Sequence, residues 1–125
     1  MANTKLLLVE DDENLAYMEK SCFEDIIGGY EVKTAVNGKE GLKVWQDFQP
    51  DVIVSDIDMP IMDGIEMVKK IREVDGKTII LFTTGLTSPK ALKAGYAAGA
   101  NNYVKKPFIP EELDAHIHSL LQLKA

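Results

Sequence analysis

The feature that most constrains this chain is a strict alternation of short, mainly apolar runs with segments of helical periodicity. The runs at 5–9, 52–55, 78–83 and 102–104 are predicted to be strands covered by helices on both faces, because such strands lack polar alternation. A fifth predicted strand, 30–35, instead places Glu31 and Lys33 between less polar residues. A charged, alternating strand is typical of the edge of a sheet.

Four of the segments between or after these runs carry apolar stripes at helical spacing. The stripes are Leu15, Met18, Cys22 and Ile26; Leu42, Trp45 and Phe48; Ile65, Val68 and Ile71; and Leu113, Ile117, Leu120 and Leu121. A further helix is predicted over 89–97, with Ser88 as its N-cap and Pro89 at its first position. This helix has the weakest apolar face.

Strict alternation of strands and helices predicts a doubly wound α/β fold, with a five-stranded parallel sheet and right-handed crossovers. Because 30–35 reads as an edge strand, the strand order 2-1-3-4-5 is favoured. The length of 125 residues suits one domain over 1–125, with no output domain expected in this chain. In such sheets, ligands bind at the carboxyl ends of the strands.

Composition narrows the classes of function. Hydrophobic residues make up 46% of the chain and charged residues 27%, which are globular values. The net charge of −6 argues against a nucleic-acid partner, and no apolar run approaches a membrane span. Cys22 is the only cysteine, so an internal disulfide cannot form. We therefore expect a cytoplasmic protein with no membrane contact.

Polar residues follow the predicted strands at the edge where a ligand would bind. They are Glu10, Asp11 and Asp12 after the first strand, Asp56 after the third, Thr83 and Thr84 at the fourth, and Lys105 and Lys106 after the fifth. Clustered carboxylates need a cation, and hard oxygen ligands suit Mg²⁺. Such a site can hold a carboxylate nucleophile, a metal ion and an incoming phosphoryl group.

These motifs, in this order and spacing, resemble the receiver domain of bacterial response regulators, whose fold is flavodoxin-like (βα)5. The matching segments are Leu7-Leu8-Val9-Glu10-Asp11-Asp12, Ser55-Asp56-Ile57-Asp58-Met59-Pro60, Asp63-Gly64, Thr83 and Lys106-Pro107-Phe108. The resemblance covers nearly the whole chain.

The resemblance implies a role for each site residue. Asp56 would be the phosphoacceptor, with Thr83 and Lys106 binding the phosphoryl group. The Mg²⁺ ligands would come from Glu10, Asp11, Asp56 and Asp58, with Asp11 a direct ligand and Asp58 contributing its backbone carbonyl. Thr83 and Tyr103 would form the switch, and the Lys106–Pro107 bond would be cis.

The resemblance also implies the partners. A sensor histidine kinase or a histidine phosphotransfer protein would donate the phosphoryl group, and a downstream protein would read the face formed by the fourth helix, fifth strand and fifth helix. The chain would be a phosphoacceptor switch and not an enzyme, either a monomer or a phosphorylation-dependent dimer. Asn101, Asn102, His116 and His118 replace the charged residues with which many receivers pair on this face, so those pairs are not expected here.

Two other functions fit parts of the pattern. Asp56 and Asp58 also resemble the nucleophile motif of haloacid-dehalogenase-type phosphatases, although Pro60 stands where that motif has threonine or valine. A receiver-like interaction module that is never phosphorylated is the third possibility. The complete set of acidic pair, aspartate, threonine and lysine favours the receiver.

Overall fold

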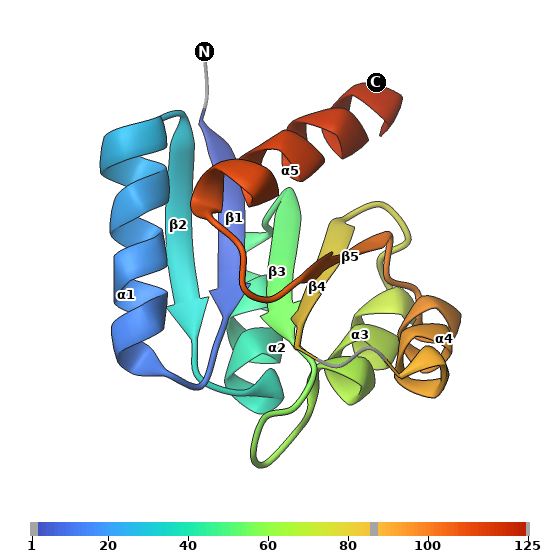
Figure 1. Cartoon of the computed structure of the whole chain (residues 1–125). Helices are drawn as coiled ribbons and strands as arrows, with labels where there is room; N and C mark the ends of the chain where they lie inside the picture. The colour runs from blue at the N-terminus through green and yellow to red at the C-terminus, as the bar shows by residue number, and fades with distance from the viewer. Residues whose placement is uncertain (1–2, 86–87, 125) are drawn as a thin grey trace.

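Five parallel strands form one sheet in the computed structural model, which describes residues 3–85 and 88–124 (Figure 1). Along the chain the elements are β1 (Thr4–Val9), α1 (Glu13–Ser21), η1 (Cys22–Ile27), β2 (Tyr30–Ala35), α2 (Gly38–Phe48), β3 (Val52–Asp56), α3 (Gly64–Arg72), β4 (Ile79–Thr84), α4 (Pro89–Ala98), β5 (Asn102–Lys105) and α5 (Pro110–Lys124). The strand order is β2-β1-β3-β4-β5, which confirms the predicted topology. All five predicted strands are present, with bounds that differ from the predicted ones by one residue at most.

The sheet separates two apolar cores, one on each face. One core packs alternate side chains of the strands, such as Leu6 and Leu8 of β1, against Phe23 of η1 and Leu113 of α5. The other packs the intervening side chains against α2, α3 and α4, with Met67 fully buried. Because both faces are covered, the central strands are apolar up to their carboxyl ends, where Ser55, Asp56, Thr83 and Thr84 are buried polar residues.

Three loops at the carboxyl edge of the sheet end in helix caps. The side chains of Asp12, Asn37 and Asp63 accept backbone N–H bonds at the starts of α1, α2 and α3. Ser88 is the N-cap residue of α4, as predicted, but its side chain makes no capping hydrogen bond. Helix α4 is therefore held less firmly at its first turn than the three helices before it.

The predicted stripe of the first helix is wrong as a core face. Met18 and Ile26 are 66% and 78% exposed, whereas Ala16 and Phe23 are buried. The buried face lies one residue further along the chain at each position and includes half-buried Glu19, whose charge hid this register in the sequence. The chain from Cys22 to Ile27 also winds as a π-helix, which the apolar spacing does not indicate.

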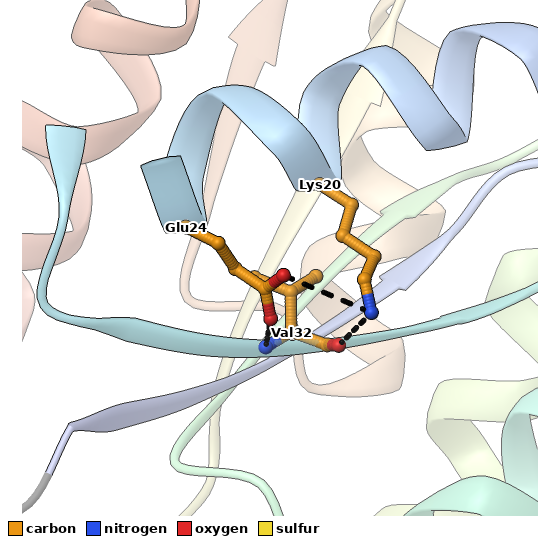
Figure 2. Close-up of polar contacts among 3 residues, drawn as sticks. All are labelled: Lys20, Glu24 and Val32. Carbon is orange, nitrogen blue, oxygen red and sulfur yellow. Dashed lines mark hydrogen bonds and ion pairs between the residues drawn. The ribbon is translucent and has the colours of Figure 1, made fainter. Parts of the chain in front are cut away.

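The outer edge of β2 is covered by one side chain from α1 and one from η1. Lys20 Nζ donates to the Val32 carbonyl oxygen at 3.1 Å, and the Val32 N–H donates to Glu24 Oε2 at 2.9 Å (Figure 2). The Lys20 ammonium and Glu24 carboxylate also lie 3.8 Å apart. Both backbone groups of Val32 are thus satisfied, so this position cannot pair with another strand.

Among the residues that the structure describes, no helix is long and apolar enough to span a bilayer.

Replacing Glu24 with alanine should lower the free energy of unfolding by about 1 kcal/mol, because the Val32 N–H loses a charged acceptor. The measurement is urea denaturation, with Glu31→Ala on the exposed side of the same strand as the matched control. If the two variants unfold at the same urea concentration, the contact contributes nothing to stability.

Candidate functional site

The predicted site residues meet at the carboxyl edge of the sheet. Glu10 follows β1, Asp56 ends β3, Thr83 is in β4 and Lys106 follows β5. Asp56 lies opposite Thr83 in the β3–β4 register, and the carboxylate oxygens of Glu10, Asp11 and Asp56 all lie within 4.8 Å of one another. Parallel pairing therefore assembles side chains from four strand ends in one place.

Asp56 is the centre of this group and is only 8% exposed. Lys106 Nζ lies 2.6 Å from Asp56 Oδ1, and the Thr83 hydroxyl donates to the same oxygen at 2.9 Å. The Lys106–Pro107 bond that positions this lysine is cis, as predicted. Two donors aimed at one carboxylate oxygen would also be in place to stabilise negative charge arriving at that oxygen.

Glu10 is buried beside Asp56, and this environment disfavours its ionised form. Burial, followed by the contact with Asp56 and its charge, raises the pKa of Glu10 from 4.5 to about 8. Burial alone would lower the pKa of Lys106, but its bond to Asp56 and the nearby carboxylates raise that pKa overall. The site thus carries an excess of acidic groups over bases.

The acidic group fits a hard divalent cation. Glu10 Oε2 is buried and has no hydrogen-bond partner among the described residues. Such an oxygen is free to act as a ligand to a metal ion. Asp11 is exposed and completes a set of three converging carboxylates. The oxygen-only donor set suits Mg²⁺. The Asp58 carboxylate is exposed and outside this set, which leaves only its predicted backbone ligand role.

An open cleft of about 240 Å³ lies over Asp56. It is lined by Asp56, Ile57, Asp58, Thr83, Thr84, Gly85 and Lys106. A small molecule or a partner side chain can therefore reach the Asp56 carboxylate from solvent.

Tyr103 lies away from the cleft, beneath α4. Its ring is half-buried between Phe82 and Tyr96, and its hydroxyl donates to the Leu92 carbonyl oxygen at 2.8 Å. A methyl group at Gly95 would lie 1.7 Å from that hydroxyl, so only glycine leaves room for the ring here. The predicted switch residues Thr83 and Tyr103 thus do not share a contact site. They are connected through the paired strands β4 and β5.

Two features of the site region were not predicted. The misassigned stripe of α1 lines an apolar groove of about 800 Å³ with Phe108 and Lys106. Glu19, also on α1, is half-buried and lines the same small cavity as Lys106. The spacing of Met18 and Ile26 could have indicated the groove, whereas no local signal marks Glu19.

The fold and this site define a receiver domain. The chain matches the family model of the response regulator receiver domain over residues 6–118, and it belongs to that family. Receiver domains are phosphoacceptor switches of two-component signal transduction.

Relatives with described roles are longer proteins. The chain is 35% identical to the transcriptional regulatory protein PrrA of Mycobacterium leprae, covering 98% of the chain and 52% of PrrA. It is also 35% identical to the alkaline phosphatase synthesis transcriptional regulatory protein PhoP of Bacillus subtilis, covering 96% of the chain and 49% of PhoP. The chain spans about half the length of these relatives.

Solved structures of similar size share the fold. The chemotaxis protein CheY4 of Vibrio cholerae is 39% identical with a TM-score of 0.87, covering 94% of this chain and 98% of that one. The receiver domain of the Francisella response regulator 1452 is 32% identical with a TM-score of 0.87, covering 98% of this chain and 100% of that one.

Without Mg²⁺, the raised pKa of Glu10 should make stability fall as the pH rises. The folded protein keeps a proton that the unfolded chain releases above about pH 4.5, so this stabilisation is complete below that pH and is lost as the pH passes about 8. Glu10→Gln, which mimics the protonated carboxyl, should match the parent near pH 5 and exceed it by roughly 1–2 kcal/mol near pH 9.

Urea denaturation in the presence of a chelator measures this difference. Glu31→Gln, exposed on β2, is the control and should follow the parent at every pH. Curves for Glu10→Gln and the parent that stay parallel across this range would contradict the assigned environment of Glu10.

Proposed function

We propose that this receiver accepts a phosphoryl group on Asp56, in a Mg²⁺-dependent relay from a sensor histidine kinase or a histidine phosphotransfer protein. The observation that carries the proposal is the convergence of Lys106 and Thr83 on one oxygen of Asp56, beside the acidic group of Glu10 and Asp11. Aspartate is a known covalent acceptor, and convergent donors supply the stabilisation that phosphoryl transfer needs.

In this reaction an Asp56 carboxylate oxygen bonds to phosphorus as the bond from phosphorus to the donor's imidazole nitrogen breaks, and that nitrogen keeps the electron pair. Lys106 and Thr83, already within bonding distance of Asp56 Oδ1, would shift to the phosphoryl oxygens. Mg²⁺ held by Glu10, Asp11, Asp56 and the Asp58 carbonyl would neutralise charge on the transferred group. Thr83 binds the phosphoryl group only by leaving its present contact.

The proposed output is a change on the face formed by α4, β5 and α5. Phosphorylation adds about 1.5 to 2 negative charges and strong acceptor oxygens next to Thr83. A shift of Thr83 toward that group moves the end of β4, against which β5 and Tyr103 pack. The equilibrium between two positions of the Tyr103 ring, one beneath α4 and one turned outward, would then shift toward the position beneath α4.

The phosphodonor partner is proposed to dock at the groove beside Lys106. Tyr17, Met18, Ile26 and Ile109 are large apolar side chains at or near this groove, each at least half exposed. Exposed apolar side chains gathered beside a reactive group are typical of an interaction surface. A downstream protein would read the α4-β5-α5 face.

Asp56→Asn should abolish phosphorylation by acetyl phosphate and Mg²⁺, because the amide is not a nucleophile. Intact mass spectrometry gives the measurement. Asp58→Asn is the matched control and should still be phosphorylated, since only its backbone is assigned a role. A phosphorylated Asp56→Asn protein would exclude Asp56 as the acceptor.

The same experiment tests the phosphatase alternative. A haloacid-dehalogenase-type enzyme would turn over a phosphoester continuously and would lose that turnover in Asp58→Asn, its proposed general acid. The receiver should instead accumulate a single phosphoryl group per chain in both the parent and Asp58→Asn.

Gly95→Ala should displace the Tyr103 ring, because the new methyl group would overlap its hydroxyl. Asp56 should still be phosphorylated, but the chemical-shift changes of Tyr103 and its neighbours that accompany phosphorylation should be lost in heteronuclear NMR spectra. Gly76→Ala, where a methyl group meets nothing within 4 Å, is the control. A normal Tyr103 response in Gly95→Ala would remove this ring from the mechanism.

A further inference from the structure

Glu19 is a half-buried carboxylate beside the site that the proposed function does not use. It lies on α1 and shares a cavity of about 10 Å³ with Glu10, Thr83 and Lys106. A space of this size holds at most one water molecule. Within this cavity almost no solvent screens the charges of Glu19 and Lys106, although both residues also line the open groove beside α1.

The charges of these groups act on each other. Burial raises the pKa of Glu19 to about 7, the charge of Asp56 adds to this rise, and Lys106 opposes it. Glu19 is in turn one of the carboxylates that raise the pKa of Lys106. Among the described residues no hydrogen bond or close ion pair holds the Glu19 carboxylate, so it is available to the lysine.

We propose that Glu19 is a positioning residue that competes with the phosphoryl group for the Lys106 ammonium and thereby slows phosphorylation of Asp56. The flexible four-carbon stem of lysine can serve either partner. Lys106 must leave Asp56 Oδ1 and bind the oxygens of the transferred phosphoryl group. While its ammonium is paired with Glu19, it cannot stabilise the negative charge on that group. The inference rests on the proposed function.

The test compares phosphorylation rates of the parent and Glu19→Gln with acetyl phosphate and Mg²⁺. In this reaction Asp56 takes the phosphoryl group, and acetate leaves with the electron pair of the broken bond. Glu19→Gln should be phosphorylated roughly three- to tenfold faster, the range expected for removing one partly screened charge. Glu31→Gln changes the net charge equally at a distant, exposed position and should match the parent.

Two further variants separate competition for Lys106 from simple repulsion of the anionic donor. In a Lys106→Ala background, Glu19→Gln should change the rate by less than about twofold, because there is no ammonium left to compete for. Glu19→Asp keeps the charge and should fall between the parent and Glu19→Gln.

Each outcome decides one proposal. If the parent itself gains no phosphoryl group, the proposed function fails. If the parent is phosphorylated but Glu19→Gln is no faster, or if its acceleration persists without Lys106, the inference about Glu19 is wrong and the proposed function stands. Acceleration that depends on Lys106 and is reduced in Glu19→Asp supports it.

Discussion

The structure depends on the ion pair between Lys106 and Asp56, which balances three carboxylates crowded at one edge of a parallel sheet. The oxygens of Glu10, Asp11 and Asp56 approach within 4.8 Å of one another, and Lys106 is the only cation in the described part of the chain that forms an ion pair with them. Burial first, and then the contact with Asp56 and its charge, raise the pKa of Glu10 to about 8, so these carboxylates do not all ionise readily. The same excess of carboxylates over cations would favour binding of a divalent cation.

The backbone around Asp56 leaves little freedom for the proposed acceptor. A side chain at Gly64 would lie 2.2 Å from the Asp56 carbonyl oxygen, so α3 can start directly against β3 only with glycine there. The Gly64 N–H donates to the Ile57 carbonyl oxygen at 2.8 Å, and Asp63 caps the helix. The sequence pair Asp63-Gly64 therefore fixes the loop after Asp56 against the first turn of α3.

The sequence was sufficient for the strand order and for the convergence of Glu10, Asp56, Thr83 and Lys106, because both follow from strand periodicity and from the rule that parallel strands end at one edge. It was insufficient for Glu19. A glutamate between Met18 and Lys20 on a helix reads as solvent-exposed, and only the loop after β5, distant in sequence, brings Lys106 to it. The exposed face of Met18 and Ile26 was missed for a related reason, since apolar spacing does not say which stripe faces the sheet.

Strand β5 connects the two ends of the proposed switch, and its backbone is firmly held. At its start, Asn101 Oδ1 accepts hydrogen bonds from the Ile80 N–H at 2.7 Å and from Arg72 at 3.0 Å, so this asparagine has a structural role where a charged dimer contact was considered. At its end, the Lys106 N–H donates to the Thr84 carbonyl oxygen at 2.8 Å. Because hydrogen bonds hold both ends of β5, a conformational change on this face must come from the side chains of β5 and from helix α4, which covers them. Helix α4 buries only Gly95 and Ala98 and lacks a side-chain cap at its start, so it is the helix over β5 that can yield most easily when Tyr103 moves.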